Sequence, residues 1–195
     1  MAENNGCKAQ VAIDRIKYDD GKDWRIVDLR LTSGKAAVHA DMLEWNVATP
    51  VEEAAGSVIS AIFGTVQYSM MLSDLPQDHL KMIAHWVRFA EEHRNALQKG
   101  SFRGFSPEAG YPVLCGECDK ERIFGVYGND RVVKIGGIDR KTFVLNGSGV
   151  PSVCVELPRN ARFEVRDTFG ATVGSDEAKA GISRISVPLG GYIIF

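Results

Sequence analysis

A short segment, residues 37–46, places an acid, an imidazole and an indole close together. Asp41 follows His39 by two positions and precedes Trp45 by four. Cleavage of a glycosidic bond needs a carboxylic acid that protonates the leaving oxygen, and an aromatic face commonly supports a sugar ring. These residue types therefore predict carbohydrate chemistry, with Asp41 as the catalytic acid and with His39 and Trp45 as substrate-binding residues.

The neighbours of Asp41 fit this role. Met42 and Leu43 would remove water from the carboxyl group, and desolvation favours its protonated form. His39 lies two positions away, so in a strand it would share the same face and reach the carboxylate or a sugar hydroxyl. The structural alternative makes Asp41 a loop or capping acid, His39 a hydrogen-bonded core residue and Trp45 a packing residue.

The elements around this segment predict βα units. Residues 36–39 read as a short buried strand, and Thr49 with Glu52 forms a capping box that starts a helix ending near Gly64. Residues 66–70 are compatible with a second strand. A second helix is expected from about residue 77 to residue 98. Its apolar stripe consists of Leu80, Ile83, Val87, Ala90 and Leu97, and Trp86 broadens it. Strand, helix, strand and helix in this order are typical of a parallel barrel or sheet, where chemistry sits after the strand ends.

The rest of the chain changes character after residue 106. Short β-compatible runs alternate with turn residues at the spacing of an antiparallel sandwich. The runs are residues 111–114, 122–127, 131–135, 142–145, 152–157, 162–166, 182–187 and 192–195. The sequence thus predicts an α+β protein with a polar lead-in over 1–24, a partial barrel over 25–106 and a C-terminal antiparallel β domain over 107–195.

Composition narrows the classes of partner. The chain has 195 residues and a formal net charge of -2, with a pI near 6.1. A chain with this charge balance lacks the excess of basic residues that binding to nucleic acid or to an anionic membrane requires. No apolar run approaches the ~20 residues of a membrane span, and the first residues lack a signal-peptide core. We therefore expect a soluble cytoplasmic protein with no nucleic acid and no membrane as partners.

Cys115 and Cys118 form a lone CxxC motif. Such a pair can be half of a zinc site or a redox pair, but a structural zinc needs two further ligands at comparable spacing. A redox pair should open a helix, whereas this motif lies in a run of strand and turn. The sequence therefore favours two ordinary side chains and predicts neither a metal nor a cofactor.

The motifs together resemble the last catalytic segment of family 36 glycoside hydrolases, the α-galactosidase or melibiase group. The similarity covers somewhat under half of the chain and fades after Pro112. The matching segments are residues 28–34, Val38-His39-Ala40-Asp41-Met42-Leu43-Glu44-Trp45, residues 50–52, residues 63–69 and residues 75–94.

The resemblance implies a (β/α)8 barrel followed by a C-terminal antiparallel β domain, acting on α-galactosides with retention of configuration. Two carboxylates do this chemistry, one as nucleophile and one as acid/base. Asp41 is the match to the family's acid/base aspartate, although the family's serine before it is Ala40 here. Asp28 and Arg30 are expected to orient substrate, or to form an ordinary ion pair at the barrel rim.

The second carboxylate is missing from this match. The family's nucleophile stands in an upstream Lys-Trp-Asp segment, whereas Lys22-Asp23-Trp24 has a different order and lies too close to Asp41. A complete barrel also takes about 250 residues. We therefore expect a C-terminal fragment that is inactive alone and that associates with itself through exposed barrel edges. The alternative is a non-catalytic carbohydrate-binding or accessory protein with a β-sandwich.

Overall fold

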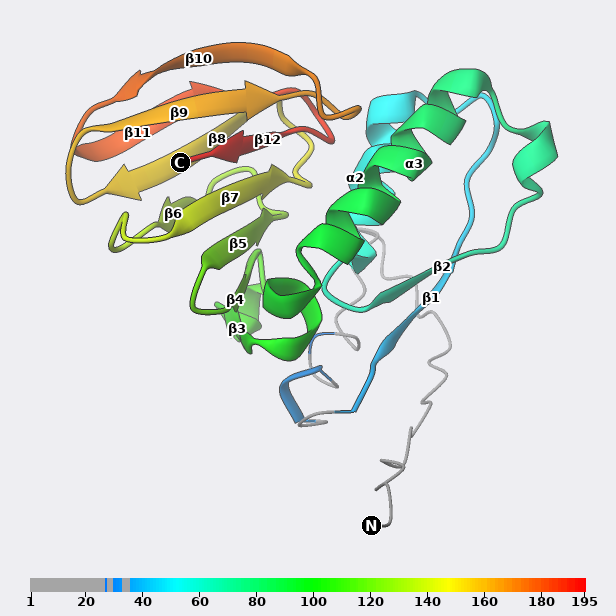
Figure 1. The fold of residues 1–195 in the computed structure, drawn as a ribbon, viewed down its shortest axis with the longest axis horizontal. Helices are drawn as coiled ribbons and strands as arrows, with labels where there is room; N and C mark the ends of the chain where they lie inside the picture. The colour runs from blue at the N-terminus through cyan, green and yellow to red at the C-terminus, as the bar shows by residue number, and fades with distance from the viewer. Residues whose placement is uncertain (1–26, 28–29, 33–35) are drawn as a thin grey trace.

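The protein is an α+β structure in which a seven-stranded sheet lies between a helical layer and a three-stranded sheet (Figure 1). The computed structural model describes residues 27, 30–32 and 36–195. No helix in these ranges is long and apolar enough to cross a membrane. Strands outnumber helices along most of the described chain.

The helical layer begins with a strand–helix–strand–helix unit, as the sequence predicts. Its elements are β1 (His39–Leu43), α2 (Val51–Ala61), β2 (Thr65–Tyr68), the 3-10 turn η1 (Leu72–Asp74) and α3 (Gln77–Glu92). β1 and β2 pair in parallel and form a two-stranded sheet, with α2 as the crossover between them. Parallel strands need such a crossover because the chain must return to the same end of the sheet.

The start of α2 differs from the predicted capping box. Pro50 is the N-cap residue, and no side chain caps the helix. The carbonyl oxygen of Pro50 accepts from the backbone N–H groups of Glu53 and Ala54, which leaves Thr49 one position too early to cap the helix. The capping-box prediction was therefore wrong, whereas the apolar face was sufficient to place the helix. That face buries Val51, Ala54, Ala55, Val58, Ile59 and Ala61.

The apolar stripe of α3 shares Ile83 and Trp86 with the predicted one but differs from it at other positions. The buried residues are His79, Met82, Ile83, Trp86 and Phe89. Val87 instead remains 39% exposed, and Ala90 is only partly buried. The large aromatic side chains, Trp86 and Phe89, turn toward the seven-stranded sheet and set the rotation of the helix, because they bury the most apolar area. α3 is followed by the π-helical turn η2 (Asn95–Lys99).

The two remaining sheets contain ten strands. The larger has the order β10 (Thr172–Ala178), β9 (Ala161–Arg166), β12 (Tyr192–Ile194), β7 (Lys141–Asn146), β5 (Glu121–Val126), β4 (Val113–Glu117) and β3 (Ser101–Phe105). The smaller has the order β11 (Gly181–Ser186), β8 (Ser152–Leu157) and β6 (Val132–Lys134). The short turn η3 (Pro107–Ala109) joins β3 to β4. Most strand pairs in these two sheets are antiparallel, as the sequence predicts. β5 pairs with β7 in parallel, and so does β6 with β8, which the sequence did not predict.

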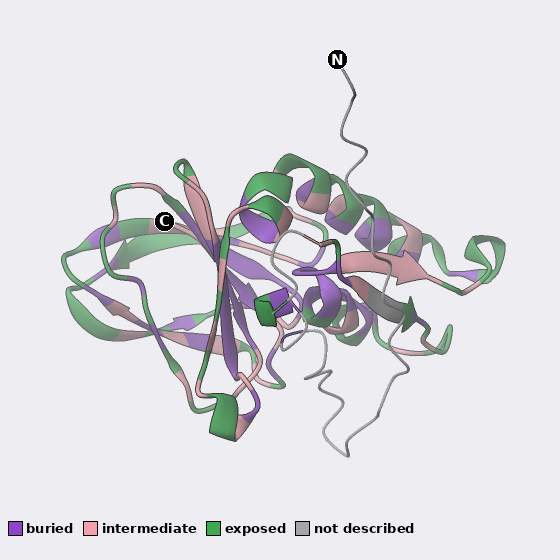
Figure 2. Cartoon of the chain, turned by 90° about the horizontal axis from the view of Figure 1, so that it is seen from below, coloured by how far each residue is buried: buried purple, intermediate pink, exposed green. Residues whose placement is uncertain are grey.

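The seven-stranded sheet is covered on both faces. Along β7, Phe143 and Leu145 join the core beneath the helices, whereas Val144 joins the core between the two sheets. This alternation follows from the period of two residues in a strand. Figure 2 shows the buried residues concentrated in these central strands and on the inner side of the helices. The large sheet therefore separates two hydrophobic cores, one beneath the helices and one between the two sheets.

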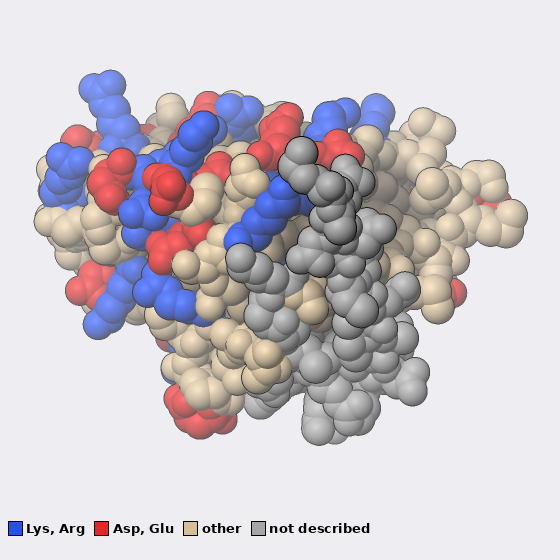
Figure 3. Space-filling view, turned by 60° about the horizontal axis from the view of Figure 1, so that its bottom comes forward, with Lys and Arg blue, Asp and Glu red and all other residues tan. Residues whose placement is uncertain are grey.

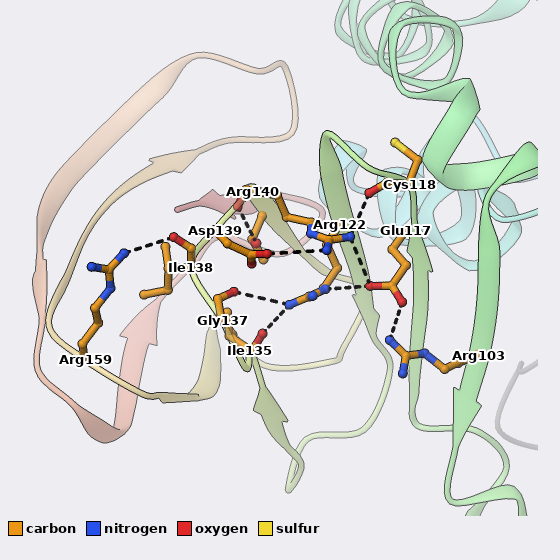
Figure 4. A network of polar contacts seen from close by, with 11 residues as sticks. Arg103, Glu117, Cys118, Arg122, Ile135, Gly137, Ile138, Asp139, Arg140 and Arg159 are labelled. Atoms are coloured by element: carbon orange, nitrogen blue, oxygen red, sulfur yellow. Dashed lines mark hydrogen bonds and ion pairs between the residues drawn. The ribbon is translucent and has the colours of Figure 1, made fainter.

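A polar network closes one end of the sandwich. The carboxylate of Glu117 accepts from Arg103 Nη2 at 2.6 Å and from Arg122 Nε at 3.0 Å. Arg140 Nη1 lies 3.8 Å from the same carboxylate and donates to the carbonyl oxygen of Cys118. Figure 4 shows the three guanidinium groups converging on Glu117, and Arg122 also bonding the backbone of the loop after β6. The network ties that loop to β4 and β5.

Candidate functional site

Aromatic and imidazole side chains meet where the carboxyl ends of β1 and β2 face the first turn of α3. Trp45 follows β1 by two residues, Tyr68 is the last residue of β2, and His79 lies in the first turn of α3. Because parallel strands end at the same edge of their sheet, the segments that follow them are brought together. This edge is the candidate functional site.

A hydrogen bond between Trp45 and His79 holds this edge together. The indole Nε1 donates to Nδ1 of His79 at 2.9 Å, which requires a neutral imidazole with its proton on Nε2. His79 is 2% exposed, and its backbone N–H is bonded to the carboxylate of Asp78. The orientation of the indole is therefore fixed by a buried partner.

Tyr68 adds an aromatic wall to the same group. Its ring lies edge-on to Trp45, with centroids 6.3 Å apart and planes at 87°. This T-shaped geometry is a favoured one for aromatic pairs. Burial raises the pKa of Tyr68 to about 12. The phenol therefore stays protonated at neutral pH and cannot act as a base there.

His39 is bonded to the neighbouring strand. Gln67 Nε2 donates to Nδ1 of His39 at 3.3 Å, across the parallel pair β1–β2. The imidazole is partly buried, and its Nε2 remains as the ring position that can carry the proton. His39 thus lies in β1, and Trp45 lies in the segment that follows β1. Both residues were predicted to bind substrate.

Of the two predicted carboxylates, only the backbone of Asp41 lies within the described residues. The backbone of Asp41 lies in β1, between His39 and Leu43, but its side chain lies outside the described residues. Asp28 also lies outside them. The acid role of Asp41 and the proposed pairing of Asp28 with Arg30 therefore stay predictions.

Arg30 lies at the other end of α3. Its Nη2 donates to the carbonyl oxygen of Leu97 at 2.8 Å, and its guanidinium is 5.3 Å from the ring centroid of Phe102. Desolvation lowers the pKa of Arg30 from its ordinary value of 12.5. The guanidinium group nevertheless remains charged at neutral pH. Leu97 follows the last turn of α3 and His79 is in its first turn, so the part of the helix between them alone spans roughly 20 Å. Arg30 anchors the start of β3 and does not contact Trp45 or His79 in the described interactions.

The CxxC pair does not form a joint site. Cys115 is 1% exposed in the core between the two sheets. Cys118 packs against the core beneath the helices. A spacing of three residues sends the two side chains to opposite faces of the sheet. Within the described ranges, no three His, Cys, Asp or Glu side chains are grouped closely enough to hold a metal ion.

The sequence did not single out Tyr68, Gln67 or His79 as site residues. His79 is not part of the apolar stripe that the sequence predicts for its helix. Its position in the first turn of the helix that follows β2 was the available signal, since such segments gather at one edge in parallel sheets. The surface elsewhere carries interspersed basic and acidic side chains on the face that Figure 3 presents.

Comparison with known proteins adds no family assignment to this geometry. No family model matches the chain. A search of curated proteins also finds no match.

Proposed function

We propose that this chain is the C-terminal part of a retaining glycoside hydrolase that acts on α-galactosides, similar to family 36 enzymes. In this proposal the carboxyl group of Asp41 protonates the glycosidic oxygen as it leaves and then takes a proton from water. The nucleophilic carboxylate comes from barrel strands outside this chain. The β1–α2–β2–α3 unit followed by a two-sheet β domain supports the proposal, because it has the order of elements that the resemblance implies.

The observation that carries the proposal is the Trp45–His79 hydrogen bond at the carboxyl ends of the strands. A bond from a partly exposed indole to a buried imidazole orders an aromatic ring at the edge where β/α proteins bind substrate. His39 stands on the same strand as Asp41 and offers its second ring nitrogen to a sugar hydroxyl. We assign substrate binding to His39 and Trp45, and a more distant bracing role to Arg30 and Asp28.

The proposal includes the cellular setting. The described cysteines, Cys115, Cys118 and Cys154, are free thiols, which is typical of a reducing compartment. We therefore place the protein in the cytoplasm. No cofactor takes part in the proposed reaction, since proton transfer and nucleophilic attack by carboxylates suffice.

Turnover of an aryl α-galactoside tests the proposal. The purified chain should release no phenol above the uncatalysed rate, because one carboxylate without its partner cannot form the glycosyl-enzyme intermediate. An Asp41→Asn variant is the matched control and should be indistinguishable from the wild type. Turnover by the wild type that Asp41→Asn abolishes would overturn the fragment proposal.

A second candidate function, carbohydrate binding without catalysis, is favoured by a cleft in the β domain. A hollow of about 720 Å³ lies between β9, β10 and β11, with Phe163, Asp176, Glu177 and Arg184 among its lining residues. Polar side chains around an aromatic ring suit a sugar. Calorimetric titration with galactose and its oligosaccharides distinguishes the candidates: binding lost in Arg184→Ala but kept in Trp45→Ala supports the accessory function.

A further inference from the structure

β2 has an outer edge to which no described strand is paired. On its inner edge, Thr65 N–H donates to Val38 O, and Ser69 N–H donates to Leu43 O. Because peptide groups alternate in direction along a strand, those of Val66 and Tyr68 point to the outer edge. All four residues of β2 are only partly buried. An edge strand presents N–H and C=O groups that can pair with another strand, so this edge is a template for one.

A hollow lies beside this edge. It has a volume of about 310 Å³ and lies between α2, β2 and α3, with Val66, Val87 and Ala90 among its apolar lining residues. Val87 and Ala90 belong to the apolar stripe read from the sequence, yet the fold leaves Val87 39% exposed. Trp86 also lines the hollow, and its buried Nε1 has no hydrogen-bond partner in the described part of the chain. The β2–α3 flank, defined as Val66, Val87, Ala90, Glu91 and Arg94, is therefore an incomplete apolar surface.

The charges of the flank are self-complementary. Glu91 and Arg94 both line the hollow, are exposed and lie one helical turn apart. Arg94 donates to the side chain of Gln98, and Glu91 forms no ion pair with another described residue. A two-fold axis across the flank reverses the helix direction, so that Glu91 of each copy faces Arg94 of the other. One acid and one base on the same face thus supply two reciprocal ion pairs.

We propose that the β2–α3 flank is a dimer interface whose occupant is a second copy of this chain. β2 pairs antiparallel with its copy, which extends the β1–β2 sheet across the two-fold axis. The two α3 helices lie side by side, and Val87 of each copy covers the hollow of the other. The inference rests on this surface and concerns the chain by itself, and its test does not depend on the proposed glycosidase activity. A further barrel strand is the rival occupant of the same edge.

Light scattering coupled to size-exclusion chromatography tests the proposal on the full chain. The wild type should have twice the 21.4 kDa mass of one chain. Glu91→Arg places four cations at the axis, and Arg94→Glu places four anions there, so each variant should elute with the mass of a monomer. The double variant E91R/R94E restores opposite charges and should return to the dimer mass.

Glu92→Arg is the matched control, because Glu92 is an exposed acid on the same helix that does not line the hollow. It should keep the dimer mass. A monomeric wild type overturns the proposal, as do single reversals that keep the dimer mass or a double variant that stays monomeric. Circular dichroism of each exposed-site variant should match the wild type. Because no galactoside is involved, failure here leaves the glycosidase proposal standing, and the reverse also holds.

Discussion

The indole N–H of Trp45 and the buried imidazole of His79 are 2.9 Å apart and join the exit of β1 to the first turn of α3. The two residues are separated by 34 positions in the sequence. The bond fixes the loop after β1 relative to the helix that follows β2. Any substrate that binds at the carboxyl ends of these strands meets an ordered aromatic ring rather than a free one.

Loss of either partner should destabilise the protein. His79→Leu leaves the indole donor without an acceptor, which should lower the free energy of unfolding by about 1–3 kcal/mol. Trp45→Phe should lower the free energy of unfolding by a similar amount, since it leaves Nδ1 of His79 without its hydrogen-bond donor. Urea unfolding of both single variants and the double variant checks this. A double variant that costs as much as the sum of the two singles would show that the bond contributes nothing.

Acidification should weaken the packing of α3 on the large sheet through His85. The ring stacks on Tyr192 with centroids 5.8 Å apart and 6° between planes. It also fills the space left by Gly170, whose φ of +82° and missing Cβ permit the close approach. The buried Nε2 of His85 has no described partner. Protonation would therefore place an uncompensated charge at this contact.

The direction of the pH effect follows from the pKa of His85. Desolvation lowers it below its ordinary value of 6.5, and Arg88 and Arg166 lower it further, whereas Asp167 and Glu92 oppose them. The unfolded chain then binds a proton that the folded chain does not, so stability is full above pH 6.5 and falls as pH drops toward the lowered value. Urea unfolding from about pH 8 to pH 5 measures this. In His85→Phe, which keeps a ring against Tyr192, the fall should be shallower; an unchanged slope would contradict the assignment.

The central strands of the seven-stranded sheet could be predicted from the sequence, but its two edge strands could not. β7 is buried over five of its six residues, so its apolar run is plain in the sequence. β3 and β10 lie at the two edges of the large sheet and expose most of their side chains. β3 also lies before residue 107, where the β domain was expected to begin. Edge strands bury too little to leave a hydrophobic pattern.

Neutralising Glu117 should cost more than removing one of its arginines. Glu117→Gln leaves the guanidinium groups of Arg122 and Arg140 facing each other without a shared anion, and the side chain of Arg122 is only 13% exposed. We expect a loss of about 1–3 kcal/mol in the free energy of unfolding. Arg103→Gln is the control, because that side chain is 55% exposed and should cost about 0–1 kcal/mol. Equal losses would show that the network does not brace the loop after β6.

The two thiols of the CxxC pair should differ in reactivity. Burial raises the pKa of Cys115 to about 12, and the nearby charge of Glu117 adds to this. The thiolate is the reactive form, so iodoacetamide at neutral pH should label Cys118 well before Cys115 in the folded protein. Peptide-resolved mass spectrometry gives the two rates, and unfolding in urea should remove the difference. Equal rates in the folded state would contradict the burial of Cys115.

Only some residues of the candidate site could be identified from the sequence. Local spacing identified His39 and Trp45, because both lie within a few residues of Asp41. It could not identify His79 or Gln67 as their partners, since these contacts depend on the parallel pairing of β1 with β2 and on the entry of α3. Spacing along one element predicts which residues share its face, whereas contacts between elements depend on the fold.

The most direct test of the glycosidase proposal is a chimera in which residues 25–195 replace the corresponding segment of a family 36 α-galactosidase. Hydrolysis of an aryl α-galactoside by the folded chimera is the measurement. We predict turnover that falls by about 10²–10⁴-fold in Asp41→Asn, the range for loss of a general acid, while Glu44→Gln, an exposed acid nearby, has no such effect. A folded chimera without turnover, or one whose turnover is unchanged by Asp41→Asn, would contradict the catalytic role of Asp41.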